Sequence, residues 1–154
     1  MTRLALVALL FATACADDDP APSATVVMAT PDSLMPSDDR LDDLTITIDY
    51  LDADGDLGGG TAEVHDCRSD TLVTILDIPA IAPSDIVDGD ASIKGTLDLH
   101  VNDVGVTTSS AVPEACADLG IDEMGSNEAI FCVILVDAAG HTGTGDCTAA
   151  IAIE

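Results

Sequence analysis

The sequence predicts an all-β protein, a single antiparallel β-sandwich of about seven strands. Apolar and polar residues alternate along several short segments, which is the period of two expected of half-buried strands. Glycine, proline and aspartate separate these segments at the spacing typical of a sandwich. No convincing amphipathic helix interrupts the pattern.

The clearest alternation lies in residues 44–50 (LTITIDY), and residues 92–101 (SIKGTLDLHV) repeat it. Residues 129–136 (AIFCVILV) are apolar on both faces, so they predict a strand in the middle of a sheet. The other expected elements are an edge strand at 23–29, strands at 62–67, 72–78, 104–112 and 147–153, and a helical turn at 114–119.

The N-terminal segment has the order of an export signal. Arg3 is followed by an apolar run over residues 4–11 and by small residues directly before Cys15. The run is far shorter than the roughly 20 residues that span a bilayer. The segment resembles bacterial lipoprotein signals, and the resemblance implies a lipid anchor on Cys15; an ordinary cleaved signal is the alternative. Residues 1–14 are then the signal, 15–22 the lipidated cysteine and acidic tether, and 23–154 the sandwich.

The composition is strongly acidic. The chain has 29 acidic residues against 4 basic ones and a net charge of −25, and Arg3 would leave with the signal. Such a charge repels nucleic acid, so nucleic-acid binding is excluded. Hydrophobic residues nevertheless make up 47% of the chain, which predicts a folded core rather than disorder.

Four cysteines follow Cys15: Cys67, Cys116, Cys132 and Cys147. An even number in an exported chain predicts two disulfides, while zinc binding would favour a close C-x-x-C pair that is missing here. Strand alternation points Cys67 and Cys132 outward, which favours a Cys67–Cys132 bridge and leaves Cys116 with Cys147. A Cys132–Cys147 bridge across the final hairpin is the other pairing considered.

The best metal candidate is the acidic turn DADGDLG. Asp52, Asp54 and Asp56 occupy alternate positions of this glycine-containing loop, and Glu63 stands twelfth when Asp52 is counted as first. Calcium takes about six to eight oxygen ligands in irregular geometry, so it is the expected ion. The sixth position is not the glycine of an EF-hand, and strands flank the loop. A solvated acidic turn is the alternative, and the acidic loop at residues 85–90 is a weaker candidate.

Residues 44–57 (LTITIDYLDADGDL) and 131–140 (FCVILVDAAG) resemble the immunoglobulin-like and fibronectin type III-like modules of bacterial surface proteins. The resemblance implies adhesion, spacing or display with a protein or cell-surface partner, not catalysis. No G-x-S-x-G or H-E-x-x-H motif occurs. The expected function is therefore a non-enzymatic, lipid-anchored module of the periplasm or cell surface, stabilised by calcium. The alternative is a small exported enzyme or metal-scavenging protein that uses the acidic loops and histidines.

Overall fold

The computed structural model describes residues 21–35, 42–69, 73–81, 92–105, 112–125 and 127–154. The predicted signal with Cys15, most of the tether, the acidic loop at 85–90 and much of the predicted strand at 104–112 lie outside these residues.

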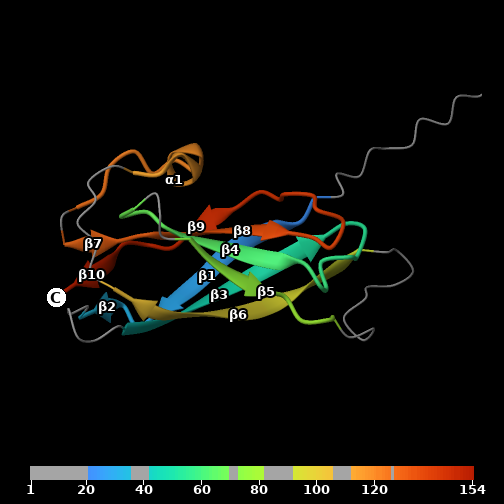
Figure 1. The fold of residues 1–154 in the computed structure, drawn as a ribbon, viewed down its shortest axis with the longest axis horizontal. Helices are drawn as coiled ribbons and strands as arrows, with labels where there is room; N and C mark the ends of the chain where they lie inside the picture. The colour runs from blue at the N-terminus through green and yellow to red at the C-terminus, as the bar shows by residue number, and fades with distance from the viewer. Residues whose placement is uncertain (1–20, 36–41, 70–72, 82–91, 106–111, 126) are drawn as a thin grey trace, which may run out of the picture.

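Two antiparallel sheets form the body of the fold (Figure 1). One has the order β1-β3-β6, with β1 at Ser23–Thr30, β3 at Asp42–Asp52 and β6 at Ile93–Val104. The other has the order β5-β4-β8-β9, with β5 at Val73–Asp77, β4 at Thr61–Asp66, β8 at Phe131–Val136 and β9 at Asp146–Cys147. The predicted all-β, sandwich-like architecture is confirmed, with α1 (Glu114–Asp118) as the one helix among the described residues.

A third, small sheet lies at the end of the molecule that carries the C-terminus (Figure 1). It has the order β2-β10-β7, with β2 at Ser33–Leu34, β10 at Ile151–Ile153 and β7 at Glu128–Ala129. The described residues thus contain ten strands rather than about seven. The excess corresponds to the two-residue strands β2, β7 and β9, which are too short to leave a periodic pattern in the sequence.

Strand β3 shows how the alternating pattern becomes structure. Its apolar residues, Leu44, Ile46, Ile48 and Tyr50, are all buried. The polar residues between them face outward and bond to β6, where the Thr47 hydroxyl donates to the Asp98 carboxylate at 2.7 Å. The predicted half-buried strand is confirmed.

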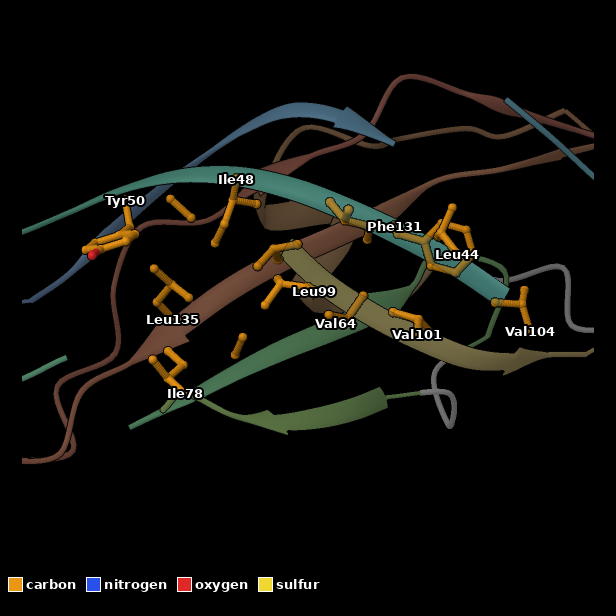
Figure 2. Close-up of a cluster of buried hydrophobic side chains, with 14 of the residues drawn as sticks. Leu44, Ile48, Tyr50, Val64, Ile78, Leu99, Val101, Val104, Phe131 and Leu135 are labelled. Atoms are coloured by element: carbon orange, nitrogen blue, oxygen red, sulfur yellow. The ribbon is translucent and has the colours of Figure 1, made fainter. Parts of the chain in front are cut away.

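The apolar core lies between the two sheets (Figure 2). Figure 2 shows side chains of β3 and β6, such as Ile48 and Leu99, meeting Val64 of β4 and Leu135 of β8. Strand β8 pairs with both β4 and β9, so the prediction of a strand in the middle of a sheet is confirmed. Phe131 is the largest fully buried side chain, and aliphatic residues otherwise dominate this core.

The final strand differs from the prediction. Instead of one strand over residues 147–153, β9 ends at Cys147 and β10 begins at Ile151 in another sheet. The backbone N–H of Thr148 donates to the Phe131 carbonyl, and the backbone N–H of Phe131 donates to the Thr148 hydroxyl. These bonds hold the chain to β8 just before it crosses to the small sheet.

A second apolar cluster covers one end of the outer face of the four-stranded sheet. Cys67, Cys116 and Cys132 are buried there beneath side chains of the α1 region, including Leu119 and Met124. The disulfides are Cys67–Cys116 and Cys132–Cys147. This corrects the Cys67–Cys132 pairing favoured by the sequence, and Cys132–Cys147 is the alternative that the sequence left open. Register explains the correction, because Cys132 and Cys147 lie directly opposite each other in the β8–β9 pair.

A buried ion pair closes the same end of β4. The Arg68 guanidinium donates to the Asp66 carboxylate through Nε at 2.9 Å and Nη2 at 2.6 Å, and Nη2 also donates to the Gly105 carbonyl. Arg68 lies over the Phe131 ring at 5.9 Å from its centroid. Asp66 and Arg68 are each only 7% exposed, so the ion pair is shielded from solvent.

Removal of Arg68 should therefore destabilise the fold strongly. We expect Arg68→Ala to lower the free energy of unfolding by about 3 kcal/mol, because it leaves the Asp66 carboxylate buried without its cation. Urea denaturation measures the change. Lys94→Ala is the control, since Lys94 is exposed on β6 and its loss should change the stability little. Equal small losses in both variants would contradict the assignment of Arg68 as a structural cation.

Candidate metal centre

Strand pairing brings two loops together at one end of the sandwich. Asp52 is the last residue of β3 and begins the loop to β4, while Asp137 directly follows β8. The start of β4 lies beside the end of β8, because Thr61 pairs with Val136. Figure 1 shows both connections at the end opposite the C-terminus.

The two loops also contact each other through their backbones. The Ala138 N–H donates to the Asp56 carbonyl at 3.2 Å. Gly60 is packed so closely that a Cβ atom would collide with the Val136 carbonyl oxygen. The acidic turn is therefore fixed against β8 by tertiary contacts, and not only by its own sequence.

Four carboxylates converge at this contact. Oxygen atoms of Asp52, Asp54, Asp56 and Asp137 all lie within 4.8 Å of one another. Asp52 is fully buried and Asp137 is 3% exposed, whereas Asp56 is half-buried and Asp54 is exposed. The cluster thus has a buried base formed by two strand ends and a solvent-facing side formed by the turn.

Two carboxylate oxygens of the cluster are buried without a hydrogen-bond donor. Asp52 Oδ2 accepts from the Leu57 N–H at 2.8 Å, but Asp52 Oδ1 has no partner among the described residues. Asp56 Oδ1 is likewise buried and unpartnered within the described ranges. An unpaired buried carboxylate oxygen is costly unless it is protonated or meets a water or a cation, so both atoms mark a place where a cation could bind.

The electrostatics of the cluster agree with this hydrogen-bond pattern. Burial raises the pKa of Asp52, the Leu57 N–H opposes the rise, and the charge of Asp54 adds to it. Burial also raises the pKa of Asp56, with a further contribution from the negative charge of Asp137. Both carboxyl groups are therefore harder to ionise in the cation-free protein than a free aspartate is.

Asp137 is stabilised differently. Burial by itself would raise its pKa, but hydrogen bonds from the His141 backbone N–H and ring outweigh burial, so the pKa of Asp137 is lowered. The hydrogen bond between the His141 ring and Asp137, 2.8 Å from Nδ1 to Oδ2, also raises the pKa of His141. The negative charges of Asp137, Asp54 and Asp56 add to this rise in the pKa of His141. The ionised form is thus favoured at Asp137, in contrast to Asp52 and Asp56.

The donor set fits a hard divalent cation. Carboxylate oxygens are the ligands that calcium prefers, and calcium tolerates irregular geometry. Asp54, Asp137 and His141 form a second possible ligand group within 4.8 Å, which would suit a metal that accepts nitrogen. In that group, however, His141 Nδ1 is already engaged with Asp137.

Three of the four ligands proposed from the sequence come together, and the fourth does not. Asp52, Asp54 and Asp56 share the cluster, whereas Glu63 is not among the carboxylates within 4.8 Å. Glu63 lies on β4 between Ile75 and Ile134 of the neighbouring strands, with Oε2 3.4 Å from His65 Nε2. The EF-hand spacing that nominated Glu63 does not apply here, because Glu63 lies in β4 and this strand leads away from the acidic turn.

Sequence analysis does not nominate Asp137 as a member of this cluster. The only local signal is an aspartate directly after a buried strand. Its proximity to Asp52 depends on the β4–β8 register, which no short motif encodes.

The chain enters the fold beside this cluster. Ser23, the first residue of β1, pairs with Leu51, which directly precedes Asp52. The backbone N–H of Thr144, in the segment after His141, donates to the Pro22 carbonyl, and the Ala24 N–H donates to the Thr144 carbonyl. Both loops that carry the carboxylates therefore contact the point where the tether joins the fold.

The chain matches no protein-family model, and comparisons with curated proteins and with solved structures also found no match. Among the described residues, no helix is long and apolar enough to cross a membrane.

Neutralising Asp52 should stabilise the cation-free protein. We expect Asp52→Asn to raise the melting temperature in chelator-treated buffer at pH 7. The asparagine keeps an acceptor for the Leu57 N–H and removes a buried charge from a group whose raised pKa disfavours ionisation. Calorimetry measures the change. Asp77→Asn removes the same charge from an exposed site on β5. An equal rise in its melting temperature would mean that both variants only relieve the general repulsion among negative charges.

Proposed function

We propose that the protein is a non-enzymatic β-sandwich module of the cell envelope that binds calcium and is tethered to a membrane by lipid on Cys15. The observation that carries the calcium proposal is Asp52, which is fully buried, belongs to the group of four carboxylates, and has an Oδ1 atom without a hydrogen-bond partner among the described residues. A bound cation would supply the positive charge that this oxygen lacks.

Repulsion among the carboxylates supports the same proposal. Two like unit charges about 5 Å apart repel by about 3 kcal/mol at an effective dielectric constant of about 20. Four carboxylates within such distances make several repulsive pairs, in a chain whose net charge is already −25. Calcium would convert this repulsion into coordination, with backbone carbonyls and water completing its shell.

The position of the cluster suggests what calcium would do for a tethered module. Force transmitted through a tether would act first on β1 near Ser23, which pairs with Leu51 beside Asp52. A cation shared by the β3–β4 loop and Asp137 would hold the two sheets together at this point. Calcium would thus stabilise the attached end of the module and leave the opposite end to meet a partner.

A role in adhesion, spacing or display fits this arrangement and the resemblance to bacterial surface modules. The partner would be a protein or another cell-surface component, because the acidic surface repels nucleic acid.

Metal scavenging is the second candidate. The group formed by Asp54, Asp137 and His141 is the observation that favours it, because histidine and carboxylates together suit zinc or copper. Elemental analysis of protein purified without added metal separates the candidates, since stoichiometric transition metal would support scavenging rather than a calcium site.

Calcium should stabilise the wild-type protein through Asp54. We expect calcium, but not magnesium at the same ionic strength, to raise the melting temperature. At a hundredfold excess over the dissociation constant the gain is about 2.7 kcal/mol. Asp54→Asn should abolish the gain, and titration calorimetry should lose its binding signal.

Glu63→Gln is the matched control, since it removes a carboxylate that the sequence nominated but that lies outside the cluster. This variant should respond to calcium like the wild type. Equal responses of wild type and Asp54→Asn would mean that the turn is only solvated, and loss of binding in Glu63→Gln would mean that the ligand set is different.

Lipidation is tested by mass spectrometry of membrane fractions. We expect mature protein that begins at Cys15 and carries acyl chains, because small residues directly precede that cysteine. Cys15→Ser should release the protein from the membrane or leave the precursor uncleaved. An unmodified mature chain that starts elsewhere would contradict the anchor.

A further inference from the structure

The two disulfides form one cluster of sulfur atoms. Cys67 follows β4, Cys116 lies in α1, Cys132 lies in β8 and Cys147 lies in β9. The first three are fully buried, whereas Cys147 is only half-buried. The cluster therefore has three buried cysteines and one partly exposed cysteine.

The two bridges touch through their buried members. Cys67 Sγ and Cys132 Sγ are 3.4 Å apart, although each is bonded to a different partner. Because neither sulfur carries a hydrogen in a disulfide, the contact joins two disulfides and is not a hydrogen bond. One member of each bridge is thus positioned next to the other bridge.

We propose that these four cysteines form a thiol–disulfide exchange site, which reacts with external thiols at Cys147 and relays the exchange to the buried Cys67–Cys116 bridge. The site is separate from the carboxylate cluster and does not depend on cation binding.

In the first step, the thiolate of an external small thiol attacks Cys147 Sγ. A new bond forms between the two sulfurs, the Cys132–Cys147 bond breaks, and Cys132 leaves as a thiolate. Attack at Cys147 is favoured over attack at Cys132, because Cys132 is fully buried. The product is a mixed disulfide on Cys147.

In the second step, the Cys132 thiolate attacks Cys67 Sγ. The Cys67–Cys132 bond forms, the Cys67–Cys116 bond breaks, and Cys116 leaves as a thiolate that takes a proton from solvent. The Cys132 thiolate forms inside the apolar cluster, where Cys67 Sγ lies 3.4 Å away, so the Cys67–Cys116 disulfide is an electrophile within its reach. No further oxidant or reductant is needed, because exchange conserves the number of disulfides.

The relay would free α1 from the sandwich. Cys116 is the residue through which α1 is cross-linked to the end of β4, and this cross-link is lost when Cys67 pairs with Cys132. A thiol that reacts at Cys147 would thereby loosen the cover of the four-stranded sheet without touching a buried sulfur directly.

Two single variants of the mature chain test the relay. In Cys116→Ser, the free Cys67 thiol faces the Cys132–Cys147 bridge, and exchange would move the free thiol to Cys147. We expect alkylation followed by non-reducing peptide mapping to find the label mainly on Cys147, together with a Cys67–Cys132 peptide. In Cys147→Ser, the free thiol should be shared between Cys132 and Cys116, again with a Cys67–Cys132 peptide.

If either variant fails to fold, the relay can be tested on the wild-type protein. Brief treatment with limiting glutathione, followed by acid quenching, should yield glutathione on Cys147 and the Cys67–Cys132 peptide. Label confined to Cys67 in folded Cys116→Ser, with Cys132–Cys147 intact, would overturn the relay. Glutathionylation of wild-type Cys147 without any Cys67–Cys132 peptide would also overturn it.

Discussion

The antiparallel pairing of β4 with β8 is the constraint on which the rest of the structure depends. Its register opposes Val64 to Val133 in the core, Thr61 to Val136 at one end and His65 to Cys132 at the other. The same register therefore builds the apolar core, brings the acidic turn beside Asp137 and carries Cys67 into contact with Cys132. A slip of one residue would reverse every side chain of β4 between core and outer face, and would disrupt all three.

The two ends of β4 are stabilised in different ways. At the Cys67 end, the Asp66–Arg68 pair supplies its own counter-charge and two disulfides fasten the outer layer. At the acidic end, four carboxylates meet, and His141 Nδ1 lies 2.8 Å from the Asp137 carboxylate. At the first end the chain itself supplies the counter-charge, whereas at the second end, on our proposal, a cation from solution would supply it. This asymmetry underlies the proposal of a module whose attached end responds to calcium.

An acidic chain with few aromatic residues must obtain stability from several sources. Aliphatic side chains fill most of the core, so Phe131 and Tyr50 are exceptions among its buried residues. Burial of such a core leaves a small net free energy after the cost of chain ordering, as in any small domain. Disulfides and a coordinated cation would each add a few kcal/mol to that margin, and loss of one partner of the buried ion pair would cost about as much. The surface can then stay highly charged, which favours solubility.

Local pattern alone determined the fold class and the major strands, because a period of two in residues such as Leu44, Ile46 and Ile48 is a property of neighbouring residues. It also identified Asp52, Asp54 and Asp56 as a candidate site, since they share one turn. Only the tertiary structure decided that Asp137, and not Glu63, lies beside these three carboxylates, that Cys132 pairs with Cys147, and that the last strand divides between two sheets. Each of these depends on which strands lie side by side and in which register, and that choice is made by the packing of the whole core rather than by any segment of the chain.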